Sequence, residues 1–163
     1  MTQTYQKREA RGAFSPLPGT IAGLVATLPM TLFLLIIQRL LPEWQQYALP
    51  PEKATQEMAE RTGTDKYLDK PRLVGSSIIS HFGYGAAMGA LYTTLTRQLR
   101  LQPVLKATLF GLAIWAASYL GWMPLANMPV AATREPLRRN LMMILAHVVW
   151  GSVTGAIAAR LEQ

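Results

Sequence analysis

The chain of 163 residues contains no cysteine and few charged residues, and both shortages restrict what it can be. Without cysteine there is no disulfide, thiolate nucleophile, zinc ribbon or iron–sulfur cluster. Charged residues make up 15% of the chain, against about 25% in typical soluble domains, while half of the residues are apolar. This combination predicts a chain that lies partly in lipid.

The motifs of common enzymes and of nucleic-acid binders are also missing. No Walker loop, dinucleotide fingerprint or G-x-S-x-G sequence occurs, and the long apolar stretches contain no carboxylate. The net charge is +7, but lysine and arginine occur singly or in pairs, without a basic stripe that would follow a phosphate backbone. We therefore expect neither an enzyme, nor a cation transporter, nor a nucleic-acid-binding protein.

Four long stretches contain no charged residue, and each is long enough to cross a bilayer. They comprise residues 12–38, 73–96, 107–133 and 140–159. A helix needs about 20 residues to span about 30 Å of hydrocarbon. Because none of the stretches alternates apolar and polar residues, they predict helices rather than barrel strands. We expect one all-α transmembrane domain over residues 1–163, an integral membrane four-helix bundle with spans near 19–41, 73–96, 104–125 and 137–159.

The polar segment between the first two spans, residues 42–72, predicts a short helix near 51–61. A proline suits its first turn, Glu57 is followed four residues later by Arg61, and a glycine then provides a typical helix stop. The apolar face of this helix is only one alanine and one methionine wide. We expect a solvated cap over the bundle rather than a membrane-surface anchor.

Spans two and four contain the same motif, a histidine followed by an aromatic residue and two spaced glycines. The second span reads His81-Phe-Gly-Tyr84-Gly85-Ala-Ala-Met-Gly89, and the fourth reads His147-Val-Val-Trp150-Gly151-Ser-Val-Thr-Gly155. Spans one and three correspond more faintly, with Gly19-x-x-x-Gly23 against Ala107-x-x-x-Gly111. The repeat predicts two tandem helical hairpins, which as parallel repeats would be related by a pseudo-twofold axis along the membrane normal.

The repeat also predicts where the two histidines lie. His81 follows Arg72 by nine residues and His147 follows Arg139 by eight, so each should lie about 12 to 14 Å inside the last interfacial charge. Residues four apart share a helix face, and glycines there let helix backbones approach closely. We therefore expect both imidazoles at matched depth and buried against protein. The helix-packing residues would include Gly19, Gly23, Gly111, Tyr84 and Trp150.

Three roles remain open for the histidines. In the first, each neutral imidazole bonds a hydroxyl or carbonyl group on a neighbouring helix and so locks the bundle, without any cofactor. In the second, the imidazoles are axial ligands of a haem or chlorophyll-type tetrapyrrole, and nearby glycines clear space for the macrocycle. In the third, the histidines sense or relay protons. The cofactor site of the second role would comprise His81, Gly85, Gly89, His147, Gly151 and Gly155.

The eight methionines are the remaining candidates for chemistry, as ligands of copper. Methionine is flexible, however, and commonly fills gaps in apolar cores. No cluster of spaced methionines pairs with a histidine at one level of the predicted bundle. We interpret the methionines as packing residues and expect no metal site.

These residues resemble a group of small bacterial inner-membrane proteins of the YagU type. The likeness lies in Gly-x-x-Ala-Gly at residues 19–23, Leu-Pro-Pro at 49–51, His-x-x-aromatic-Gly at 81–85 and Ala-His-x-Val-Trp at 146–150. It covers most of the chain in scattered positions, and the long polar loop departs from it in sequence and length. The resemblance implies a multi-spanning inner-membrane protein, linked by the family name to acid tolerance, and it supplies no catalytic residues.

These features predict a non-enzymatic, multi-pass protein of the bacterial inner membrane. Its small size, the lack of a polar route through the spans and its outward leucine, isoleucine and methionine residues favour a structural or accessory subunit. Its partners would be the lipid bilayer and either other membrane subunits or further copies of the chain. A haem- or pigment-binding protein and a proton-responsive protein, each using His81 and His147, are the alternatives. The distribution of basic residues leaves the membrane orientation open.

Overall fold

The computed structural model describes residues 15–128 and 131–163, which form helices and turns with no strand among them. The all-helical class predicted from the sequence is therefore confirmed. The five long helices are α2 (Leu17–Gln38), α3 (Pro50–Thr62), α4 (Lys70–Thr96), α5 (Pro103–Ala116) and α7 (Leu137–Leu161). The connections contain three single 3₁₀ turns, η1 (Glu43–Gln45), η2 (Asp65–Tyr67) and η4 (Ala132–Arg134). A π-helical segment, η3 (Ala117–Trp122), and the short α6 (Met123–Leu125) extend α5 into one longer helix.

Local sequence explains where several helices begin and end. Prolines occupy the first turns of α2, α3, α4 and α5, where their missing N–H group has no helical partner to lose. The side chain of Asp69 caps α4 by accepting a hydrogen bond from the backbone N–H of Arg72, at 3.0 Å. Gly63 ends α3 with a φ of 68°, a conformation that favours glycine.

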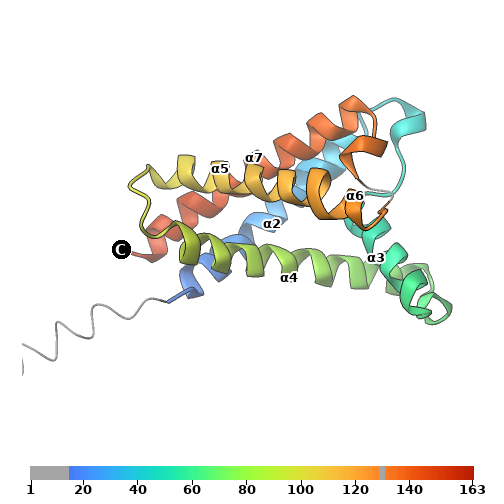
Figure 1. Cartoon of the computed structure of the whole chain (residues 1–163), viewed down its shortest axis with the longest axis horizontal. Coiled ribbons are helices and arrows are strands. Elements are labelled where there is room, and N and C mark those ends of the chain that lie inside the picture. Colours follow the sequence, from blue (N-terminus) through green and yellow to red (C-terminus); the bar gives the residue numbers. More distant parts are fainter. Residues whose placement is uncertain (1–14, 129–130) are drawn as a thin grey trace, which may run out of the picture.

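The long helices form a bundle in which α4 and α7 run in one direction and α2 and α5 in the other (Figure 1). α2 packs against both α4 and α7, and α5 packs against α7. α4 and α5 meet near the turn that joins them, where the Tyr92 hydroxyl donates to the carbonyl of Pro103 at 3.2 Å. At the opposite end of the bundle, α3 packs against α4.

Glycines bring two of these helix pairs into backbone contact. In the α2–α4 pair, a Cβ atom on Gly23 would lie 2.3 Å from the carbonyl oxygen of Gly85. In the α5–α7 pair, a Cβ atom on Gly151 would lie 2.5 Å from the carbonyl oxygen of Ala107. Such close approach is how helices gain packing energy where lipid is as apolar as the side chains.

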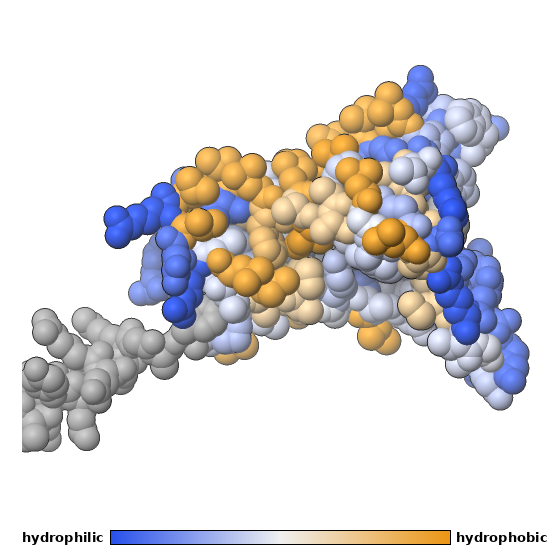
Figure 2. All heavy atoms as spheres, in the orientation of Figure 1, coloured by the Kyte–Doolittle hydropathy of each residue, from blue (hydrophilic) through white to orange (hydrophobic). Residues whose placement is uncertain are grey.

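Within the described residues, three helices are long and apolar enough to cross a membrane: Leu17–Gln38, Pro103–Leu125 and Leu137–Leu161. Figure 2 shows apolar side chains across the middle of one face and hydrophilic ones at both ends. We predicted a fourth span at residues 73–96, within α4. Although α4 has 27 residues, its serines, threonines and glycines make it less apolar than the other three, so this span is not confirmed.

Candidate functional site

A cavity of about 570 Å³ lies between α4 on one side and α5 with η3 on the other. α2 and α7 contribute its inner wall through Thr27, Met30 and Trp150. α3 borders its end near the polar loop, through residues that include Ala54 and Met58. The cavity thus occupies the part of the bundle where α4 and α5 do not pack against each other.

The described wall of this cavity is uncharged and mainly apolar. It contains no aspartate, glutamate, lysine or arginine side chain. Five methionines and four large aromatic residues line it: Met30, Met58, Met88, Met123, Met143, Tyr84, Tyr119, Trp122 and Trp150. Methionine side chains adapt to irregular shapes, and an unpaired charge would be costly to bury here. The wall therefore suits a neutral, mainly apolar molecule.

Both histidines of the repeat line this one cavity. His147, on α7, is 7% exposed, and its Nδ1 lies 2.8 Å from the carbonyl oxygen of Met143, one turn earlier in the same helix. Its ring meets the Tyr119 ring edge-on, with the ring centroids 6.0 Å apart. These contacts fix the orientation of the imidazole, and they leave Nε2 without a hydrogen-bond partner in the described chain.

His81, on α4, lacks even a bond of this kind. Neither of its ring nitrogens has a hydrogen-bond partner among the described residues, and its Nε2 is buried. The expectation that each imidazole bonds a group on a neighbouring helix is therefore wrong. His147 bonds its own helix, and His81 faces a space that no protein group fills. A buried polar atom without a partner is costly, so it requires an explanation.

Most of the space beside the motif glycines is occupied by neighbouring helices. A Cβ atom on Gly89 would lie 2.0 Å from the carbonyl oxygen of Gly19, and one on Gly155 would lie 2.5 Å from that of Pro103. Gly85 borders the cavity, but a Cβ atom there would lie 2.0 Å from the Thr27 hydroxyl oxygen. These glycines permit close helix packing, and they do not clear room for a macrocycle.

The two aromatic residues of the motif make different contacts. Trp150 is 4% exposed and donates from Nε1 to the carbonyl of Gly23 at 3.1 Å, which joins α7 to α2. Tyr84 is 45% exposed, and its hydroxyl lies 3.3 Å from the hydroxyl of Ser118 in η3. The tryptophan closes one helix interface, whereas the tyrosine only bridges the opening of the cavity.

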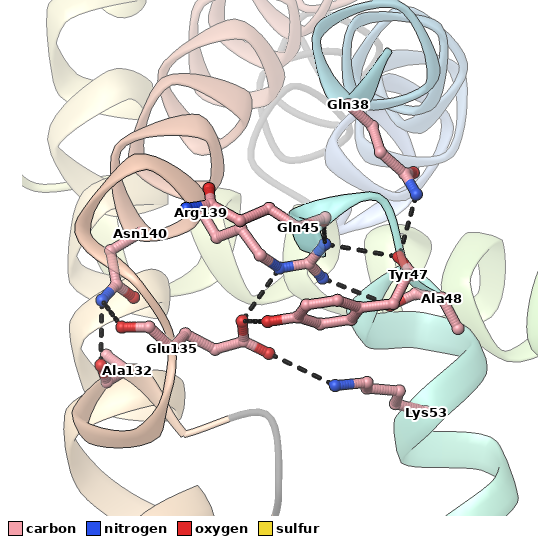
Figure 3. Close-up of polar contacts among 9 residues, drawn as sticks. All are labelled: Gln38, Gln45, Tyr47, Ala48, Lys53, Ala132, Glu135, Arg139 and Asn140. Carbon is pink, nitrogen blue, oxygen red and sulfur yellow. Dashed lines mark hydrogen bonds and ion pairs between the residues drawn. The ribbon is translucent and has the colours of Figure 1, made fainter. Parts of the chain in front are cut away.

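A cluster of charged and polar side chains, separate from the cavity, lies beside the α3 end of the bundle and is centred on Arg139 (Figure 3). This side chain is 1% exposed and donates from Nε to Glu135 at 2.8 Å. Its other nitrogens donate to carbonyl groups of the loop after α2, at 2.8 Å to Gln45 and 3.2 Å to Ala48. The depth of Arg139 at the membrane interface stays a prediction, but its side chain is buried in the protein, where these carbonyls accept its hydrogen bonds. We call Arg139, Glu135, Tyr47 and Lys53 the Arg139 cluster.

Tyr47 lies between the two cations of the Arg139 cluster. Its ring centroid is 3.8 Å from the Arg139 guanidinium carbon and 4.0 Å from Nζ of Lys53, and its hydroxyl donates to Glu135. Burial, together with this hydrogen bond, raises the pKa of Tyr47 to about 12. Nζ of Lys53 also lies 3.6 Å from Glu135. The cluster therefore fastens the start of α3 to the start of α7.

Comparison with known proteins places the chain in a family. The family model described as a protein of unknown function, DUF1440, matches residues 37–156. The chain belongs to the DUF1440 family. No curated protein and no solved structure matches it. The DUF1440 match includes both histidines and the whole Arg139 cluster, and it leaves out most of α2. The likeness to YagU-type proteins remains a prediction.

Two features of this DUF1440 chain were not predicted from its sequence. The first is the Arg139 cluster, whose only local sign is the spacing of four residues between Glu135 and Arg139. The second is η3, which supplies Ser118, Tyr119 and Trp122 to the cavity. It lies just before Pro124, which cannot donate a helical hydrogen bond, and π turns of this kind are frequent at functional sites.

Proposed function

We propose that this DUF1440 chain is a multi-pass integral membrane protein that binds a neutral, mainly apolar molecule in the cavity between α4 and α5. The uncharged cavity carries this proposal, because its wall combines apolar side chains with a few unpaired polar atoms. Concave sites of this composition are typical of small-molecule binding. The absence of a carboxylate from the described wall favours a binding role over a catalytic one.

In this proposal α4 crosses the membrane as the fourth span, which makes the bundle a pair of tandem hairpins. Support comes from the glycine contacts, which are equivalent in the two helix pairs. Gly23 approaches Gly85 in the α2–α4 pair, as Gly111 approaches Gly151 in the α5–α7 pair. α2 shields one face of α4 along this contact, so α4 needs less apolar surface than the other spans.

The experiment is to extract the protein from bacterial membranes in a mild detergent and identify bound small molecules by native mass spectrometry. We expect a neutral lipid-soluble compound to be retained by the wild type and lost in Ala54→Trp, which fills the cavity. The matched control is Ala87→Trp, on the exposed face of α4, which should retain the compound. Equal retention in both variants, or no compound with the wild type, would contradict the proposal.

An absorption spectrum of the same preparation tests the tetrapyrrole alternative. A Soret band that disappears in the double variant His81→Ala, His147→Ala would identify a haem protein instead of a binder of a neutral lipid. We expect no such band, because the neighbouring helices fill most of the space beside the glycines.

A second candidate function is that of an accessory subunit in a bacterial inner-membrane complex. It is favoured by the outer face of α4, where a Cβ atom on Gly75 or Gly83 would meet no atom within 4 Å. An open glycine face on a weakly apolar helix offers a close-packing surface to another helix. Native electrophoresis of the gently solubilised protein should then show a species well above one chain plus its micelle. A lone monomer would contradict this role.

A further inference from the structure

The hydrogen-bond pattern of His147 determines what its free nitrogen offers to a bound molecule. A carbonyl oxygen only accepts, so the 2.8 Å contact with Met143 requires that Nδ1 carries the hydrogen. In the neutral ring, Nε2 is then a bare acceptor. Because Nε2 has no partner in the described chain and His147 lines the cavity, it offers a lone pair to a ligand that can donate.

No described hydroxyl group of the cavity wall is bonded to Nε2 of His147, and most of these hydroxyls have other partners. Thr27, Thr55 and Thr62 each donate to a carbonyl one turn earlier in their own helix, at 2.8 to 2.9 Å. The hydroxyls of Tyr84 and Ser118 pair with each other. No described hydroxyl is bonded to either histidine, so the buried Nε2 of His81 also has no protein partner.

Three donors of the wall have no hydrogen-bond partner among the described residues: the hydroxyls of Ser77 and Tyr119 and the indole N–H of Trp122. Tyr119, which is 6% exposed, is the one whose ring contacts His147. A ligand hydroxyl both donates and accepts, so it matches an imidazole acceptor beside a phenol donor. A ketone, an ether or an ester only accepts, and it would leave Nε2 of His147 unpaired.

We infer that the cavity binds a lipid-soluble alcohol or phenol whose hydroxyl donates to Nε2 of His147 while its apolar part lies among the methionines. This inference rests on the proposed function and names the class of ligand. The described wall has no charged side chain that would pair with a carboxylate or phosphate group, which favours a neutral headgroup.

The test uses two probes that differ only in the donor: para-nonylphenol and its methyl ether. Each is equilibrated with the full chain in lipid nanodiscs, empty nanodiscs correct for partition into lipid, and bound probe is measured by mass spectrometry. The wild type should bind the phenol about three- to tenfold more tightly than the ether, as expected for one net hydrogen bond. His147→Phe should bind both probes equally, whereas His147→Gln, which keeps an acceptor, should retain part of the preference.

The outcomes separate this inference from the proposed function. Equal binding of phenol and ether by the wild type would overturn the hydroxyl inference and leave apolar binding intact. Failure of both probes to bind would contradict both proposals. A preference that survives His147→Phe but disappears in His81→Phe would move the acceptor to the other histidine and overturn the assignment. The wild-type comparison keeps the inference testable even if a variant does not fold.

Discussion

α2 packs against α7, and we call this pair the closed side of the bundle; α4 and α5 separate around the cavity, and we call this pair the open side. The two sides carry matching motifs, because α4 repeats the motif of α7 and α2 that of α5. On the closed side, Trp150 reaches the backbone of α2 and is buried. On the open side, Tyr84 occupies the matching motif position and reaches only a hydroxyl of η3. The glycine contacts within each hairpin are alike. The site therefore arises from the difference between the two sides, not from the shared motif.

The connections between the helices also differ in length and structure. The segment between α2 and α4 contains α3, which packs on α4 and borders the cavity, whereas the turn between α4 and α5 comprises only residues 97–102. α3 is fastened to α7 by the Arg139 cluster. The opening between α4 and α5 is thus bounded by a helix that the closed side lacks.

Removing Arg139 should have the largest effect, because it releases α3 from the rest of the bundle. Arg139→Met leaves the Glu135 carboxylate and several loop carbonyls buried without their donor, which should lower the free energy of unfolding by about 3–5 kcal/mol. The measurement is denaturant unfolding in detergent, followed by circular dichroism. Arg138→Met is the matched control, since this neighbour is exposed and should change stability little. If both variants lost the same free energy of unfolding, Arg139 would not be the residue that holds α3 in place.

Adding one methyl group to the glycine contacts tests whether the two hairpins are equally tight. Gly89→Ala and Gly151→Ala each force a Cβ atom within 3 Å of backbone on the facing helix, and each should destabilise the fold by about 1–3 kcal/mol. Gly83→Ala, on the open face of α4, should be neutral or slightly stabilising, because alanine favours helix. If Gly89→Ala and Gly151→Ala lowered the free energy of unfolding by different amounts in the same assay, the helix contacts within the two hairpins would not be equally tight.

The two aromatic residues allow a direct comparison of the closed and open sides. Trp150→Phe removes a buried hydrogen bond and part of a buried ring, and it should cost about 1–2 kcal/mol. Tyr84→Phe removes a longer bond at a half-exposed position and should cost less than about 0.5 kcal/mol. Thermal unfolding of both variants in one detergent measures this order. The reverse order would mean that the open side carries more of the stability.

Features that repeat along the chain were predictable, and features that depend on contacts between distant segments were not. The lengths of the uncharged stretches predicted the apolar helices around Gly23, Gly111 and Gly151, because span length follows from bilayer thickness. The separation of α4 from α5 depends on how whole helices pack, which no local pattern records. Arg139 resembled an interfacial arginine because its carbonyl partners, such as that of Gln45, lie more than ninety positions earlier.

The last prediction concerns pH, and it tests the cluster that fastens α3 to α7. Burial and the hydrogen bond to Glu135 raise the pKa of Tyr47 from its ordinary value of 10.0 to about 12. A raised pKa means that the folded state binds the proton more tightly than the unfolded state does. The stabilisation is complete below pH 10 and is lost as the pH rises toward 12, because ionised Tyr47 can no longer donate to the carboxylate.

Unfolding curves of the wild type and of Tyr47→Phe, recorded between pH 8 and 12, would measure this contribution. The variant lacks the hydroxyl and keeps the ring that lies between Arg139 and Lys53, so it controls for the titration of every other group. We expect the stability difference between wild type and variant to be constant up to about pH 10 and to shrink above it. A difference that stays constant to pH 12 would show that Tyr47 has the same pKa in the folded and unfolded states, so that folding does not raise it. The attachment of α3 to α7 by the Arg139 cluster would then not depend on this proton.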